Sequence, residues 1–186
     1  MDVLVHIGGY EKGNEFVFFY EIFIVAAFII ILISMYTPSQ EILEKYADLM
    51  INFAIGDGKW VQKGEIVYVQ IPECAKPFYV PLQQAILRTW GYPMMEYLAD
   101  GVSKSFFNEI SDELVSFYPK DYLLSRVETI DHRLYVLAEA DKHELEGVDP
   151  QKIFRRAQGA KFYRDALNKK ESEGKYTWTL CLYGTQ

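Results

Sequence analysis

Hydrophobic and polar positions along the chain follow two different periods, one typical of strands and one typical of helices. Four stretches are short and mainly apolar, as expected for strands, and the near-continuous apolar run at 65–71 suits a parallel sheet covered on both faces. We predict strands at residues 65–71, 93–98, 132–139 and 176–183. Between them, apolar residues recur three or four positions apart, which predicts amphipathic helices.

The first two helices are bounded by residues that favour helix ends. The first is predicted to start at Thr37–Ser39 and to end at Gly56, because serine caps helix amino termini and glycine terminates helices. Its expected buried face comprises Ile42, Tyr46, Leu49, Met50 and Phe53. The second starts near Pro77 and ends at Gly91. Its expected buried residues are Leu82, Ala85, Ile86 and Trp90.

Two later regions are also predicted to be helical. Residues 103–128 predict two helices that break at Tyr118–Pro119, because proline cannot continue a helix interior. Residues 150–175 predict one long helix, with Asp149 as its N-cap and Pro150 at its first position.

The order of these elements predicts the fold class. Strands alternating with helices indicate an α/β domain, a layered and mostly parallel sheet flanked by helices. The chain has 186 residues, enough for one domain with a substantial core. We therefore expect one α/β domain at residues 36–186, preceded by a hydrophobic N-terminal extension at residues 1–35.

The extension contains an unusually apolar stretch at residues 16–36, interrupted by Glu21 and Ser34. As a helix it is about 31 Å long, enough to cross a bilayer. Its flanks carry no positive cluster that would orient it. Three interpretations are open: a single-pass membrane anchor, translated upstream sequence with Met35 as the true start, or a buried core element.

The net charge and the cysteine content argue against several classes of protein. The net charge of −7 gives no basic footprint for nucleic acid. Cys74 and Cys181 lie far apart and form no CxxC pair, which argues against a disulfide scaffold or a cysteine-rich zinc site. We expect both to be small buried apolar residues in a reducing, cytoplasmic compartment. The alternative location is a membrane, through residues 16–36.

Short motifs that could carry chemistry are incomplete. The glycines of residues 56–64 match neither dinucleotide-binding nor phosphate-binding spacing and favour a helix stop followed by a turn. His143 and Glu144 begin an HExxH-like pattern without its second histidine. The Asp131–His132 pair could orient a general base, although such a pair more often simply begins a strand.

Two charged groups follow the third predicted strand. An acidic group lies where α/β folds place ligands, but without a partner histidine it favours a solvated loop over a metal site; it comprises Glu139, Asp141, Glu144, Glu146 and Asp149. A basic group on the last predicted helix favours a solvated or subunit-facing surface; it comprises Arg155, Arg156, Lys161, Arg164, Lys169 and Lys170. From spacing alone, we assign no catalytic, cofactor-binding or metal-binding residue.

Four ordered blocks nevertheless resemble a known family. They are EILEKYADLMINFAI, VQKGEIVYVQIPECAKPFYVPLQQAILRTWGYP, TIDHRLYVLAEADKHELEGVDPQKI and WTLCLYGTQ. Together they resemble the N-terminal part of the aminopeptidase T family of metal-dependent aminopeptidases. One departure is Gly184, where many members carry a proline.

The resemblance implies a scaffold domain beside a catalytic half that this sequence does not contain. Family members release N-terminal residues from peptides, use two divalent metal ions such as zinc or cobalt, and form homodimers. Their metal ligands lie downstream of the last block, so the resemblance implies that this chain binds no catalytic metal and is inactive alone. It also implies that the chain is cut where the second half would begin. The rival interpretation is a non-enzymatic α/β binding module anchored in the membrane.

Overall fold

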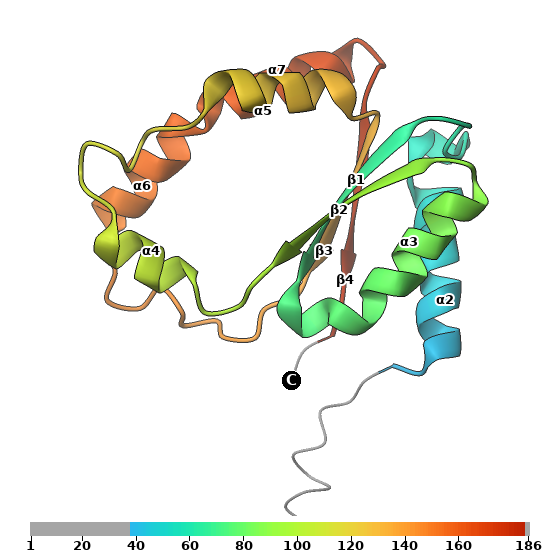
Figure 1. Cartoon of the computed structure of the whole chain (residues 1–186), viewed down its shortest axis with the longest axis horizontal. Helices are drawn as coiled ribbons and strands as arrows, with labels where there is room; N and C mark the ends of the chain where they lie inside the picture. The colour runs from blue at the N-terminus through green and yellow to red at the C-terminus, as the bar shows by residue number, and fades with distance from the viewer. Residues whose placement is uncertain (1–37, 185–186) are drawn as a thin grey trace, which may run out of the picture. The chain divides into compact units, whose positions relative to one another are not determined.

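Four parallel strands form one sheet in the computed structural model, which describes residues 38–184 (Figure 1). The strands follow the order β2-β1-β3-β4 across the sheet. They are β1 (Ile66–Pro72), β2 (Tyr92–Leu98), β3 (His132–Leu137) and β4 (Thr177–Leu182). The predicted α/β class with a parallel sheet is therefore confirmed, and each predicted strand is present within two residues of its expected ends.

One α-helix precedes the first strand, and the others lie between strands in the chain. Ser39 caps the first helix as expected, since its hydroxyl accepts a hydrogen bond from the Ile42 N–H. Asp149 likewise caps α6 through the Gln151 N–H, at 2.9 Å. The α-helices are α2 (Gln40–Leu49), α3 (Tyr79–Arg88), α4 (Ser103–Glu109), α5 (Lys120–Thr129), α6 (Pro150–Gly159) and α7 (Lys161–Ser172), with a π-helix at Met50–Ala54 and 3-10 helices at Gly56–Gly58 and Glu73–Phe78.

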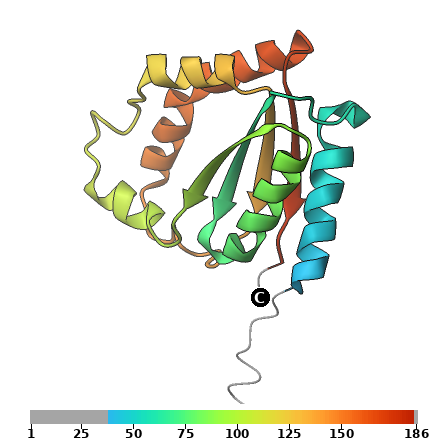
Figure 2. The ribbon, with the colours of Figure 1, turned by 45° about the vertical axis from the view of Figure 1, so that its right-hand side comes forward.

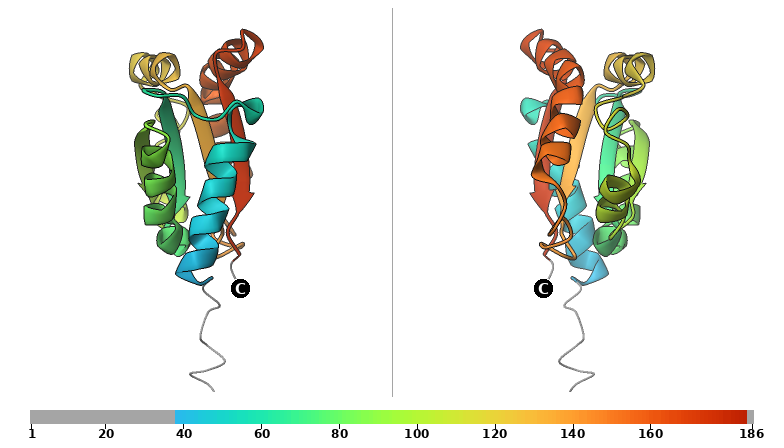
Figure 3. Two further views of the ribbon diagram at one scale, coloured as in Figure 1. Left: turned by 90° about the vertical axis from the view of Figure 1, so that its right-hand side faces the viewer. Right: turned by 90° about the vertical axis from the view of Figure 1, so that its left-hand side faces the viewer.

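The two faces of the sheet are covered by different helix pairs. Figures 2 and 3 show α2 and α3 side by side on one face. There they bury alternate strand residues such as Val67, Val69 and Leu134. On the other face α5 and α7 lie across the amino-terminal half of the strands (Figure 1). Beneath them lies a smaller cluster that includes Tyr68 and Tyr163.

The strand order places a topological switch between β1 and β3. The chain moves from β1 outward to β2 and then returns past β1 to β3. In such sheets ligands bind outside the carboxyl ends of the strands, near the switch. A ligand site is therefore expected among the loops after β1, β2 and β3.

The predicted buried face of the first helix is wrong in part. Leu49 is 53% exposed and Phe53 is 71% exposed, and Ile42 is exposed as well. The side that packs on the core instead carries Leu43 and Ala47. Both sides of this helix carry apolar residues, so apolar periodicity alone could not select the side that α3 and the sheet cover.

Two further predictions about helix ends and faces are wrong. Trp90 is 74% exposed because α3 ends at Arg88 and Trp90 adopts a left-handed backbone conformation, with φ of 64°. The long predicted helix divides into α6 and α7 at Gly159–Ala160. Gly159 lies so close to Ser116 that an added Cβ would be 2.3 Å from the Ser116 carbonyl oxygen. This close approach explains why a small residue stands at the junction.

The predictions for the N-terminal extension lie outside the described residues. These are the apolar stretch 16–36 and the alternative start at Met35. Within residues 38–184, none of the helices has both the length and the apolar character needed to span a membrane.

Candidate functional site

The loops at the carboxyl edge of the sheet are joined by carboxylates. The Asp100 carboxylate, after β2, accepts a hydrogen bond from the Cys74 N–H, after β1, at 3.1 Å. In return, the Glu73 carboxylate accepts one from the Asp100 N–H, also at 3.1 Å. Burial and the nearby Asp100 carboxylate raise the pKa of the Cys74 thiol, so this cysteine is a weak nucleophile. These acidic side chains tie the two loops together.

A small hollow of about 110 Å³ lies beside this pair of loops. Its acidic lining residues are Asp100, Glu139, Asp141 and Glu144. The Glu144 carboxylate accepts from the Ser103 N–H at the start of α4, at 2.6 Å. The Asp141 carboxylate accepts from the His143 N–H at 2.8 Å. The structure thus brings together part of the acidic group singled out in the sequence.

This acidic hollow is a poor fit for a catalytic metal. Within residues 38–184, no three His, Cys, Asp or Glu side chains converge in a way that could hold a metal ion. Three of its four carboxylates, those of Asp100, Asp141 and Glu144, already accept hydrogen bonds from backbone N–H groups. His143 does not join them, because it lies 3.9 Å from Glu146 at the surface and both side chains are largely exposed.

His132 is buried at the opposite, amino-terminal edge of the sheet. Its Nε2 lies 2.8 Å from the Glu65 carboxylate, and its Nδ1 lies 2.7 Å from the Thr177 hydroxyl. That hydroxyl also accepts from the Gly56 N–H, so its own proton is free to be donated to Nδ1. Burial raises the pKa of the Glu65 carboxyl, but hydrogen bonds from His132 and the Gln62 N–H outweigh burial and leave it lowered.

The His132 network joins four segments rather than facing a ligand. Asp131, the neighbour in sequence, is turned away from this imidazole and accepts from the Ile66 N–H at 2.8 Å. The predicted Asp–His pair is therefore the beginning of a strand, and the acid that contacts His132 is Glu65. The amino-terminal edge is also the side opposite to that where parallel sheets bind ligands.

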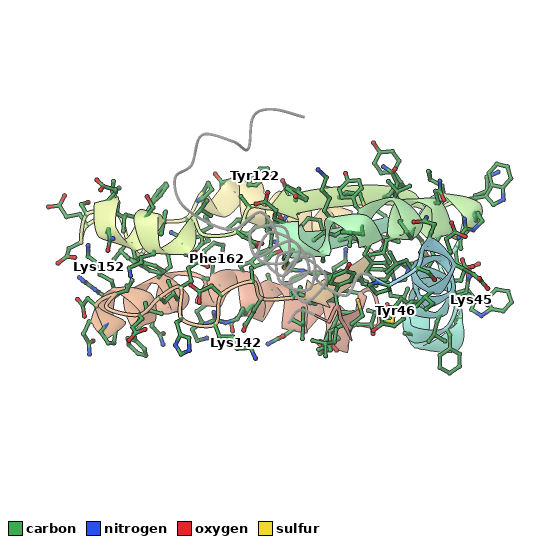
Figure 4. The ribbon with its side chains drawn as sticks, turned by 90° about the horizontal axis from the view of Figure 1, so that it is seen from below. Lys45, Tyr46, Tyr122, Lys142, Lys152 and Phe162 are labelled. Atoms are coloured by element: carbon green, nitrogen blue, oxygen red, sulfur yellow. The ribbon has the colours of Figure 1, made fainter. Side chains whose placement is uncertain are left out.

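The basic group on the last helices is used in part within the fold. Lys170 Nζ donates to three carbonyl oxygens at the end of α5, those of Val127, Glu128 and Ile130. The Arg156 guanidinium lies over the Tyr118 ring, at 3.8 Å from its centroid. Lys152 acts similarly between α4 and α6, where it reaches the Phe107 and Ile110 carbonyls (Figure 4). These contacts give Arg156 and Lys170 a structural role. Lys161 and Lys169 are exposed and lie near Asp165 and Glu173, as predicted for a solvated surface.

The two cysteines differ in burial. Cys181 is buried in the main core, and burial raises the pKa of its thiol to about 12. Cys74 is only partly buried. Both are free thiols in the described part of the chain. The expectation of a buried apolar role is therefore confirmed for Cys181 and only in part for Cys74.

Sequence reasoning missed one buried polar cluster on the sheet face below α5 and α7. Arg133 on β3 is only 7% exposed. Its guanidinium and that of Arg126 on α5 both donate to the hydroxyl oxygen of Tyr163. The signal was an arginine inside an otherwise apolar strand. Alternation of polar and apolar residues is so common in strands that this arginine alone did not indicate burial.

Comparison with known proteins gives a consistent result. A family model described as thermophilic metalloprotease (M29) matches residues 39–186. Among solved structures, wild-type AmpT from Thermus thermophilus is similar, with a TM-score of 0.64 and 20% sequence identity. The match covers 76% of this chain and 36% of that chain. No curated protein matches the sequence.

Proposed function

Because the chain belongs to the family of thermophilic metalloproteases (M29), we propose that it is the N-terminal portion of a metal-dependent aminopeptidase. Such an enzyme releases N-terminal residues from peptides. The observation that carries this proposal is the family match over residues 39–186, nearly the whole domain. The similar fold of AmpT supports it, although at 20% identity that likeness concerns the fold alone.

The role assigned to the described domain is that of a scaffold. The chain spans 36% of the AmpT chain, and residues 38–184 offer no suitable ligand cluster for a metal. We therefore propose that the two divalent ions, zinc or cobalt, are held by residues outside this range. In this proposal the domain packs beside the catalytic part, takes part in a homodimer, and has no peptidase activity alone.

An activity assay of the purified full chain tests this assignment. The chain is incubated with Zn²⁺ or Co²⁺ and an aminoacyl chromogenic substrate, beside a blank of metal and substrate alone. We expect release of the chromophore at the rate of the blank. Turnover above the blank that disappears on chelation of the metal would contradict the proposed scaffold role.

A further inference from the structure

Two tryptophans are exposed in the segments that lead into neighbouring strands. Trp60 is 62% exposed ahead of β1, and Trp90 is 74% exposed ahead of β2. Because β1 and β2 are adjacent and parallel, both segments lie at the amino-terminal edge of the sheet (Figure 1). The segments also touch. The Gly64 N–H donates to the Trp90 carbonyl oxygen at 3.0 Å, and a Cβ added at Gly91 would lie 2.7 Å from the Val61 side chain. The two tryptophans therefore belong to one surface.

Both tryptophans adopt a backbone conformation that favours glycine. Their φ angles are 63° for Trp60 and 64° for Trp90, in the left-handed region, where a bulky residue is strained. Each lies just past the end of a helix, where glycine is the usual residue. Burial does not offset this strain, because both residues are largely exposed. A contact outside the domain therefore explains these tryptophans better than packing within it.

Lysines flank this pair of tryptophans. Lys59 precedes the first of them, and Lys63 Nζ lies 5.9 Å from the centre of the Trp90 ring. Both lysines are exposed. Asp57 and Glu65 stand at the two ends of this segment in the sequence, and the Glu65 carboxylate is held by the buried imidazole of β3 at 2.8 Å. The two lysines thus make residues 58–64, between those acids, locally positive.

This composition matches the interface between water and a lipid bilayer. Tryptophan is enriched there because its ring is apolar and its N–H is polar. Lysine can lay its apolar stem along such a surface and place its charge among anionic headgroups. The net charge of −7 opposes a general attraction of the chain to an anionic membrane, so binding depends on this local surface.

We propose that Trp60 and Trp90, together with Lys59 and Lys63, form a surface that binds an anionic lipid membrane. The indoles insert at the level of the headgroups, and the lysine ammonium groups pair with lipid phosphates. The carboxyl-terminal edge of the sheet then faces away from the membrane. This inference goes beyond the scaffold role proposed above and does not depend on it.

Indole fluorescence tests the proposal, because the chain has three tryptophans. In full-length Trp178→Phe, only Trp60 and Trp90 remain as reporters. This variant is mixed with vesicles of phosphatidylcholine and phosphatidylglycerol whose acyl chains carry bromine near the headgroup, since bromine quenches indoles that enter the bilayer. We expect quenching relative to unbrominated vesicles, and its absence would overturn the proposal. Membrane binding through any other segment does not by itself produce this signal.

Two matched variants locate the contact. Trp60→Phe combined with Trp90→Phe leaves only Trp178, on β4, and we expect no quenching of it. Lys59→Gln combined with Lys63→Gln, in the Trp178→Phe background, should weaken vesicle binding by about tenfold or more. Equal quenching of the two sets of reporters, or binding that is unchanged without the lysines, would contradict the assignment.

Trp90→Gly separates membrane binding from stability. Glycine adopts a positive φ without strain, so the free energy of unfolding in urea should stay the same or rise, whereas vesicle binding should weaken. A clear loss of stability would show that this indole serves the packing of the domain itself, and the inference would fail. Because the Trp178→Phe measurement keeps both native tryptophans of the surface, it decides the matter even if another variant fails to fold.

Discussion

For single residues, the local sequence predicts some structural roles but not contacts between residues that lie far apart in the chain. The capping role of Asp149 and the burial of Cys181 could be predicted, because each depends on local pattern or residue type. The contact partner of His132 could not be predicted. The acid that meets its imidazole is Glu65, 67 positions away, whereas the adjacent Asp131 bonds to another strand.

The Glu65 carboxylate should make stability depend on acid pH. Its pKa in the folded chain lies below the ordinary value of 4.5, so the unfolded chain binds its proton more readily. The stabilisation it provides is therefore present above about pH 4.5 and is lost as pH falls through the lower folded pKa. Denaturant unfolding of Glu65→Gln should show a shallower loss of stability with acid than the unmodified chain.

A surface glutamate serves as the control for this experiment. Glu41 pairs with Lys45 on the exposed side of α2, where such pairs contribute little. Glu41→Gln should follow the curve of the unmodified chain over the same pH range. If Glu65→Gln also follows that curve, the contact between Glu65 and His132 does not make stability depend on acid pH.

At the scale of elements, the spacing of apolar residues predicted the positions of strands and helices well. It predicted less well which side of a helix is buried. The predicted strand positions were confirmed because each strand is a short apolar run bounded by turn residues. The side of α2 could not be chosen, because apolar residues occupy both its sides and only the sheet decides between them. The division between α6 and α7 depends on Ser116, which lies far from Gly159 in sequence.

Two leucines in α2 test the assigned side. Leu43 is buried in the main core, whereas Leu49 is exposed. Leu43→Ala should lower the free energy of unfolding by about 2–5 kcal/mol through lost burial and a cavity. Leu49→Ala should change it by about 0.5 kcal/mol or less. Equal effects of the two substitutions in urea unfolding would reverse the assignment.

The junction of α6 and α7 offers a second test. Gly159→Ala places a methyl group against the Ser116 backbone, and we expect a loss of about 1–3 kcal/mol in unfolding free energy from overpacking. Gly184→Ala adds the same methyl group where no atom lies within 4 Å, so its effect should be near zero. Thermal unfolding of both variants makes the comparison, and a stable Gly159→Ala would show that the helices do not approach the Ser116 turn this closely.

For the whole molecule, the fold class could be predicted from the alternation of strands and helices, but a functional site could not. The acids after β3 follow the carboxyl end of a strand, where ligands bind in α/β folds, but their pattern favoured a solvated loop over a metal site. In the structure several accept backbone N–H groups, and no metal-binding group forms within residues 38–184. The family was indicated by ordered blocks of sequence, each weak alone, and then by a match over residues 39–186.

Zinc binding by the full chain tests the central claim most directly. The claim is that this domain is the scaffold of a metal-dependent aminopeptidase and does not itself hold the catalytic ions. Equilibrium dialysis against Zn²⁺ should detect less than one tightly bound ion per chain, taking tight as a dissociation constant below about 1 μM. Two ions bound per chain below that value, and released together by a chelator, would contradict the account.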